Sequence, residues 1–269
     1  MSGFSADWLA RREPHDLRAR SAAAVEAVAA ALEQLTSVRV VDLACGTGST
    51  LRALSPHLPA RQNWKLIDND LSLLARATAT PLARHVTIAA LPLDLNRDLE
   101  AALDGPVDLV ATSALLDLVS ETWLDRLAVE IAARSIPLYA ALSYDGRIEL
   151  TPSDPFDTAI VAAVNAHQRT DKGFGPALGP AAANFAITRF EALGYSVVRG
   201  ASDWMLDPND REMQTEILAG WASAAHDMGT LRPADTAAWL ARRRAAIAAG
   251  RSSLRVGHVD FFATPSATR

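Results

Sequence analysis

Short apolar runs alternate with amphipathic segments through the first half of the chain. The run Val38 to Leu43 is apolar and rich in β-branched residues, which predicts a buried strand. Further strands are predicted at Trp64 to Ile67, Val86 to Ala89, Val107 to Ala111 and Leu138 to Leu142. Helical patterns lie between them, at about 51–58, 71–77, 97–103 and 121–133. This alternation predicts an α/β fold, with a mostly parallel sheet covered by helices on both faces.

Helical patterns also precede the first strand and dominate the chain after Tyr144. Pro14 is expected to separate a short helix, Ser5 to Arg12, from a longer one at about 16–35, since proline is tolerated mainly in the first helical turn. In the C-terminal half, helices are predicted at about 154–169, 180–193, 208–226 and 233–249, and strands at Tyr195 to Arg199 and Leu254 to Ala263. The extra helices predict a helical cap on one compact domain.

Composition narrows the functional classes. The 269 residues are 49% hydrophobic and 21% charged, which is typical of a globular protein. The net charge of −5 argues against a dedicated nucleic-acid binder, which usually has a basic face. The one cysteine, Cys45, excludes an internal disulfide and a cysteine metal cluster, and no metal is expected. No apolar signal core begins the chain and no stretch approaches the roughly 20 apolar residues of a membrane span, so we expect a cytoplasmic protein without membrane contact.

A glycine loop follows the first predicted strand, in the sequence VVDLACGTG at 40–48. The dinucleotide pattern GxGxxG lacks its third glycine because that position is Leu51, and the Lys-Ser/Thr of a P-loop is absent. Asp42 would repel a phosphate across a low-dielectric cleft. The loop therefore favours a ligand with an ammonium group and no phosphate, as in S-adenosylmethionine.

Acidic residues also follow the next two strands. Asp68 ends the second strand, where an acidic side chain can accept hydrogen bonds from both ribose hydroxyls, although an NAD site would place an acid there too. Asp94 follows the third strand and, with Leu95, can meet an adenine amino group. Each acid could instead cap a helix or stabilise a turn. Their order and spacing favour a cationic ligand that carries adenosine.

Four motifs in this order resemble those of the class I S-adenosylmethionine-dependent methyltransferases: VVDLACGTG, LIDND, LPLDL and VDLVATSALLDLV, within about 38–145. Cys45 stands where the family more often has glycine or alanine. The resemblance implies a Rossmann-like seven-stranded sheet whose last strand, antiparallel, is paired beside Tyr195 to Arg199. It also implies a single methyltransferase domain over 1–269, with an N-terminal helical segment (1–36), a cofactor-binding core (37–145) and substrate-side helices with the last two strands (146–269).

The same resemblance implies S-adenosyl-L-methionine as cofactor. The residues expected to bind it are Arg20, Asp42, Ala44, Gly46, Thr47, Gly48, Asp68, Asn69, Asp94, Leu95 and Ser113. In this family an N-terminal arginine can bind the methionine carboxylate, and Arg20 or Arg18 is the candidate. A solvated helix face is the alternative for the arginines of this segment.

Three residues are candidates for work on the methyl acceptor. Asp117 follows the fourth strand, where small-molecule methyltransferases often carry an acid facing the acceptor, but it could also cap a helix. His167 is a candidate base or a partly buried hydrogen-bonding residue. Lys172, in a Gly/Pro-rich loop, could bind an anionic acceptor, lower the pKa of an acceptor hydroxyl, or complement a helix dipole. Candidate pocket walls are Tyr144, Asp145 and Trp204.

The expected activity is methyl transfer to the oxygen or nitrogen of a small molecule. Methyltransferases that act on DNA amines carry an Asn/Asp-Pro-Pro-aromatic motif after the fourth strand, and its absence here argues against nucleic acid. Two alternatives stay open, an NAD(P)-dependent oxidoreductase and a non-catalytic scaffold that binds S-adenosylmethionine. The sequence leaves the oligomeric state open.

Overall fold

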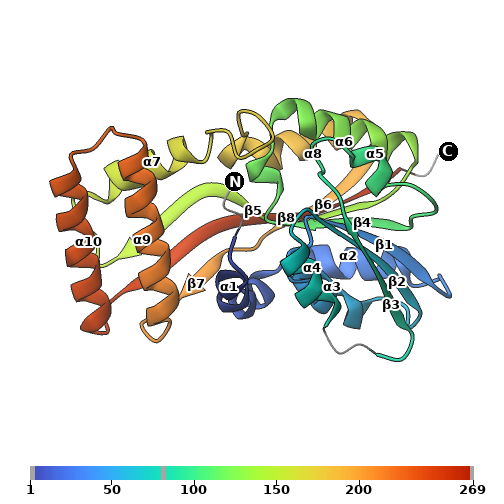
Figure 1. The fold of residues 1–269 in the computed structure, drawn as a ribbon, viewed down its shortest axis with the longest axis horizontal. Coiled ribbons are helices and arrows are strands. Elements are labelled where there is room, and N and C mark those ends of the chain that lie inside the picture. Colours follow the sequence, from blue (N-terminus) through green and yellow to red (C-terminus); the bar gives the residue numbers. More distant parts are fainter. Residues whose placement is uncertain (1–3, 80–82, 267–269) are drawn as a thin grey trace.

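The computed structural model describes residues 4–79 and 83–266, arranged around one mixed β-sheet (Figure 1). The strand order is β3-β2-β1-β4-β5-β8-β6, and a short β7 pairs with β8. The strands are β1 (Val38–Leu43), β2 (Gln62–Asp68), β3 (Val86–Pro92), β4 (Leu109–Ser113), β5 (Leu138–Thr151), β6 (Tyr195–Ala201), β7 (Trp204–Leu206) and β8 (Ser253–Pro265). Strands β3, β2, β1, β4 and β5 are parallel, so their carboxyl ends meet at one edge.

The last strand has the expected direction and place. β8 lies between β5 and β6 and is antiparallel to both. The predicted Rossmann-like sheet with an antiparallel last strand is therefore confirmed. β7 was not predicted, because a three-residue strand is too short for a periodic pattern and forms only where it pairs with β8.

Helices cover both faces of this sheet, as predicted (Figure 1). One face packs against α2 (Ala22–Leu32), α3 (Ser49–Leu54) and α4 (Leu71–Thr78). The opposite face packs against α5 (Leu99–Ala102), α6 (Glu121–Ala133) and α8 (Ala182–Ala192). Single 3-10 turns, η1 (Ser55–His57), η2 (Leu116–Leu118) and η3 (Gly179–Ala181), complete these layers.

The prediction that Pro14 separates two helices is wrong. Helix α1 runs through it, from Ala6 to Ala19, and the break comes at Arg20, after which the Ser21 hydroxyl caps α2. Proline inside a helix leaves the carbonyl four residues earlier without its partner. Here Pro14 and Ala10 are both exposed, so that carbonyl can be hydrated and the helix continues.

The cap is built on two long strands. β5 was expected to end at Leu142 but continues to Thr151, paired with β8 across two register shifts. This β5–β8 ribbon leaves the main sheet and carries α7 (Asp157–His167), α9 (Arg211–Asp227) and α10 (Pro233–Ala248), at the end of the molecule away from β1 to β3 (Figure 1). The three helices and the ribbon enclose an apolar cluster of their own around Trp239 and Leu218. Among the described helices, none combines the length and apolar character that a membrane span needs.

Candidate functional site

A cavity of about 1600 Å³ lies at the carboxyl edge of the sheet, between the strand ends and the cap. Most of the residues predicted for the site line it: Ala44, Gly46, Thr47, Asp68, Asn69, Asp94, Leu95, Ser113, Asp117, His167 and Lys172. Arg20, Asp42 and Gly48 are not on its wall. One cavity thus brings together side chains from the glycine loop, the three following strand ends and the loop after α7.

The glycine loop is held by the end of the neighbouring strand. Asp68 accepts a hydrogen bond from the Gly46 amide at 2.8 Å and another from the Asp70 amide at 3.0 Å. The Gly48 amide donates to the Cys45 carbonyl at 2.9 Å. Ala44, with φ of 53°, adopts the left-handed conformation that non-glycine residues avoid. Two amides of the loop are therefore already paired within the protein.

Asp42 lies behind the loop, with no exposed surface. Neither carboxylate oxygen makes a hydrogen bond of normal length. The pKa of Asp42 is raised to about 8, mainly by burial. The nearby Asp68 charge also raises it, whereas the Arg20 charge and the Thr50 hydroxyl lower it. Asp42 is therefore mostly protonated at neutral pH, and it does not reach the cavity wall.

Arg20 is the arginine that approaches this site. Its guanidinium donates to the Tyr139 hydroxyl at 3.2 Å and to the Ser113 hydroxyl at 3.5 Å. Burial alone would lower the pKa of Arg20, but the nearby Tyr139 and Asp260 oxygens outweigh this effect. The net pKa is raised, so the guanidinium stays charged. Arg18 is exposed and contacts His15 at 2.8 Å. Of the two candidates, only Arg20 lies beside a residue of the cavity wall.

Asp117 lines the cavity from η2. It is 5% exposed, and its Oδ1 atom has no hydrogen-bond partner among the described residues. Burial raises the pKa of Asp117 to about 6, against hydrogen bonds from the backbone of Asp117 and Tyr144 and the more distant Arg12 charge. A carboxylate with this pKa is ionised at neutral pH and can still accept a proton.

His167 and Lys172 line the same cavity. The Lys172 ammonium is 3.3 Å from His167 Nδ1 and donates to the Thr170 hydroxyl at 3.0 Å. Burial lowers the pKa of both groups, and the Lys172 charge lowers that of His167 further. Asp171 organises the loop by accepting the Gly173 and Gly175 amides at 2.6 and 3.0 Å.

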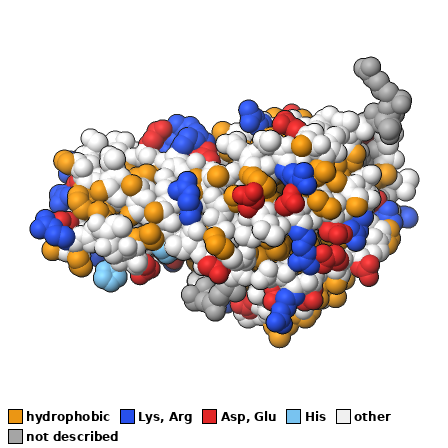
Figure 2. Space-filling view, turned by 90° about the horizontal axis from the view of Figure 1, so that it is seen from above, with side chains coloured by type: hydrophobic (Ala, Val, Ile, Leu, Met, Phe, Trp, Pro, Cys, Tyr) orange, Lys and Arg blue, Asp and Glu red, His pale blue; other side chains and the backbone are white. Residues whose placement is uncertain are grey.

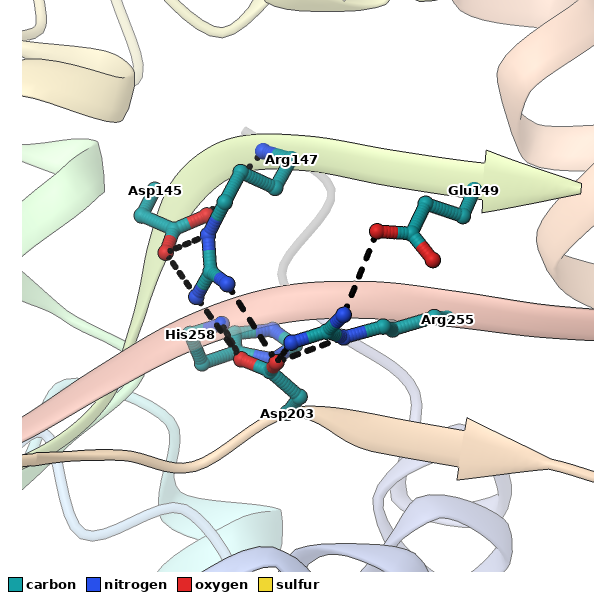
Figure 3. Close-up of polar contacts among 6 residues, drawn as sticks. All are labelled: Asp145, Arg147, Glu149, Asp203, Arg255 and His258. Atoms are coloured by element: carbon teal, nitrogen blue, oxygen red, sulfur yellow. Dashed lines mark hydrogen bonds and ion pairs between the residues drawn. The ribbon is translucent and has the colours of Figure 1, made fainter.

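Of the three candidate wall residues, Tyr144 and Trp204 line the cavity. Asp145 instead faces the ribbon, where it accepts a hydrogen bond from Arg147 at 2.7 Å (Figure 3). The network continues from Arg147 to Asp203 and from Asp203 to Arg255. Asp145 therefore belongs to a charged cluster that ties β5, β8 and the segment before β7.

The sequence analysis missed many cavity residues, among them the polar and aromatic side chains of Trp8, Arg12, Asp16 and His258. Arg12 and Asp16 are buried on α1 and form a bidentate pair, at 2.9 and 3.3 Å, and Asp16 also accepts the Trp204 indole N–H at 2.9 Å. His258 is buried on β8. The available signals were an i,i+4 charge pair in an amphipathic helix and a histidine inside the apolar run of the last strand. Neither signal tells which cavity the residue faces.

Comparison with known proteins shows the fold. No protein-family model and no curated protein matches the chain. A cyclopropane-fatty-acyl-phospholipid synthase-like protein from Lactobacillus casei superposes with a TM-score of 0.55 over 97% of this chain and 94% of that one, at 14% identity. The chain has a Rossmann-like fold.

Another solved structure covers nearly the whole chain at a lower score. It is a SAM-dependent methyltransferase from Thiobacillus denitrificans in complex with S-adenosyl-L-homocysteine, with a TM-score of 0.44 and 16% identity, over 97% of this chain and 99% of that one. A score this low adds nothing to the assignment of the fold. Within residues 4–79 and 83–266, no three His, Cys, Asp or Glu side chains gather as a metal site would require.

Proposed function

We propose that the protein transfers a methyl group from S-adenosylmethionine to an oxygen or nitrogen of a small molecule. The observation that carries this proposal is the Asp68 carboxylate, which faces the cavity while it holds the Gly46 amide. Asp94 lies on the same rim, and Asp42 lies behind it. The acids on the rim, Asp68 and Asp94, suit a ligand with ribose hydroxyls, an adenine amino group and a positive charge.

The glycine loop argues against a dinucleotide. A pyrophosphate needs free backbone amides and the N-terminus of a helix. Here the Gly46 and Gly48 amides are paired to Asp68 and Cys45, and α3 has only six residues. The acidic rim would also repel a phosphate. These features support S-adenosylmethionine over NAD(P).

Different residues of the cavity wall are assigned to different parts of the cofactor. We assign the ribose to Asp68 and Asn69, the adenine to Asp94 and Leu95, and the amino-acid end to Ala44, Gly46, Thr47 and Ser113. Gly48 keeps the loop tight, since a Cβ there would lie 3.3 Å from the Ala77 side chain and φ is 83°. Arg20 contributes a positive charge from behind the wall.

The acceptor side supplies a route for a proton. Bound S-adenosylmethionine would supply a sulfonium methyl group, whose transfer leaves a neutral thioether. Asp117 can accept the proton that an acceptor O–H or N–H loses, because its pKa is about 6 and it faces the cavity. His167 and Lys172 are the further candidates on this side, for a polar part of the acceptor.

Two features support a small acceptor over nucleic acid. The cavity lies between the sheet and the cap, and Trp8, Trp204 and Trp221 line it. On the face shown in Figure 2, acidic and basic side chains are interspersed, without a broad basic surface. The cytoplasmic location and the division into an N-terminal segment, a core and a substrate side stay predictions.

Calorimetric titration tests the cofactor. We expect S-adenosylhomocysteine and S-adenosylmethionine to bind at micromolar concentration, and NAD and NADP to give no heat. Binding of NAD without S-adenosylhomocysteine would identify the oxidoreductase alternative. The scaffold alternative is tested by following S-adenosylhomocysteine formation with a library of hydroxyl and amine acceptors, in wild type and in Asp117→Asn. A wild type that binds the cofactor but turns over none of these acceptors would support the scaffold.

A further inference from the structure

A second buried polar side chain shares the acceptor side of the cavity with Asp117. His258 lies on β8 directly opposite Tyr144 of β5, and their rings are 6.1 Å apart. Asp117 follows β4, the neighbour of β5 on its other side, and its carboxylate receives a hydrogen bond from the Tyr144 backbone. Tyr144 thus lies between Asp117 and His258, and all three line one cavity.

Both side chains present an unpaired polar atom. Asp117 and His258 are each only 5% exposed, yet Asp117 Oδ1 and His258 Nδ1 have no hydrogen-bond partner among the described residues. Buried polar atoms of folded proteins are nearly always paired, and an unpaired one calls for an explanation such as a catalytic role or a bound partner. Two such atoms on one cavity wall point to a ligand with two hydrogen-bonding groups.

The backbone around His258 is fixed. Its amide donates to Asp203 Oδ1 at 3.1 Å (Figure 3). Its carbonyl accepts the Ser202 amide at 2.9 Å. Asp203 is in turn held by Arg147 and Arg255. Trp204 packs against the imidazole with ring centroids 4.8 Å apart. The imidazole is therefore held in place before any ligand arrives.

Charge decides the kind of ligand. The pKa of His258 is lowered to about 3. Burial is the main cause, the charges of Arg12 and Arg147 act in the same direction, and the charge of Asp203 opposes them. The imidazole is neutral at physiological pH, and the Arg12 guanidinium is already paired with Asp16. The ionised Asp117 carboxylate disfavours an anion, and the positive charges of Arg12 and Arg147 that act on His258 disfavour a cation at its end of the cavity. The indole rings of Trp8 and Trp204, packed edge to face with their centroids 6.4 Å apart, add aromatic apolar surface to the cavity.

We propose that His258 and Asp117 together select the methyl acceptor, an uncharged aromatic molecule that carries a hydroxyl or amino group. This inference rests on the proposed function. The acceptor O–H or N–H donates to the Asp117 carboxylate, and a second polar group pairs with His258 Nδ1. In the transfer, the oxygen or nitrogen forms a bond to the methyl carbon, the sulfur keeps the electron pair of the broken S–C bond, and the acceptor proton passes to Asp117.

The test uses small aromatic probes and needs no natural acceptor. Phenol, 2-aminophenol, benzoate and benzylamine are titrated at millimolar concentration into the full chain saturated with S-adenosylhomocysteine. Binding is followed by the NMR signals of the six histidine imidazoles, among which His258 is assigned by its loss on substitution. We expect phenol and 2-aminophenol to shift the His258 signal, and benzoate and benzylamine to leave it in place.

Two substitutions at one position separate hydrogen bonding from shape. His258→Phe keeps a ring without a polar atom, and His258→Asn keeps a polar atom near the position of Nδ1. We expect the Phe variant to weaken 2-aminophenol binding by about tenfold and the Asn variant by about threefold or less. His57→Phe is the control, because His57 is exposed and outside the cavity. Unfolding temperature and S-adenosylhomocysteine affinity, both expected within the wild-type range, report that each variant is folded.

The outcomes separate the two proposals. Equal binding of 2-aminophenol to wild type and His258→Phe overturns the role of His258, as does a His258 signal that responds to benzoate or to none of the probes. If wild type fails to bind S-adenosylhomocysteine, the proposed function fails, and titration of the probes without it still decides whether His258 contacts them. A His258→Asn variant as weak as His258→Phe, with cofactor affinity lost in both, would show a purely structural role.

Discussion

The Asp68 carboxylate at the end of β2 accepts the Gly46 amide of the loop after β1, at 2.8 Å. One side chain thus both faces the cavity and sets the conformation of the loop beside it. The two strands are parallel neighbours, so their carboxyl ends bring residues 22 positions apart into contact. An acid at this position can both bind a ligand in the cavity and fix the conformation of the loop.

Replacing Asp68 should weaken the cofactor complex. We expect Asp68→Ala to lower S-adenosylhomocysteine affinity by at least about tenfold, since a lost hydrogen bond to a charged group costs roughly 1.5–3 kcal/mol. Calorimetry measures the change. Asp104→Ala is the matched control, because Asp104 is exposed and away from the cavity. An affinity within about twofold of wild type would falsify the ribose assignment.

Asp42 should make stability depend on pH. The folded protein holds the Asp42 proton up to a pKa of about 8, whereas the unfolded chain loses it near its ordinary pKa of about 3.9. The folded state binds more protons in this window, so the Asp42 contribution to the free energy of unfolding falls as pH rises from about 4 to about 8. The stability is fully present below that window and lost above it.

Asp42→Asn removes this titration. We expect the variant to resemble wild type at about pH 4 and to be more stable by at least about 1 kcal/mol at about pH 9, without ligand. Urea unfolding at both pH values measures the difference. Asp104→Asn should show no such divergence from wild type. A wild type as stable as Asp42→Asn at high pH would mean that Asp42 is better compensated than its lack of hydrogen bonds indicates.

Lys172 should control the protonation of His167. The ammonium lies 3.3 Å from the imidazole, and its charge lowers the pKa of His167. Lys172→Met keeps the length of the side chain and removes the charge, so the pKa of His167 should rise. NMR titration of the histidine signals measures it, and Lys65→Met, at the other lysine of the chain, is the control. An unchanged pKa in Lys172→Met would show that the two groups do not interact in solution.

Gly257 should tolerate no side chain. A Cβ there would lie 2.3 Å from Asp145 Oδ1 and 2.8 Å from Arg147 Cβ, inside the charged cluster of Figure 3. We expect Gly257→Ala to lower the free energy of unfolding by about 1–3 kcal/mol, because the cluster must move. Gly220→Ala is the matched control: nothing lies within 4 Å of its Cβ position, in the middle of α9. That change should stabilise by about 0.5–1 kcal/mol. Equal effects of the two substitutions in urea unfolding would contradict the role of the cluster.

The sequence by itself determined the order of strands and helices in the core and the acids at their ends. These features are local: an apolar run, a glycine loop and an aspartate after a strand are each visible within about ten residues. Parallel strands bring their carboxyl ends to one edge of the sheet. The sequence alone therefore predicts that Asp68, Asp94 and Asp117 lie around one site, and all three line the cavity.

Only the tertiary structure decided how deep each residue lies and what completes the site. Asp42 was expected to meet the ligand, but packing puts it behind the wall. β5 extends beyond its apolar segment because β8, more than 100 residues later in the chain, supplies hydrogen-bond partners as far as Thr151. The same pairing carries His258 into the cavity, opposite Tyr144. Burial and strand pairing depend on contacts between distant segments, and no local pattern of residues encodes them.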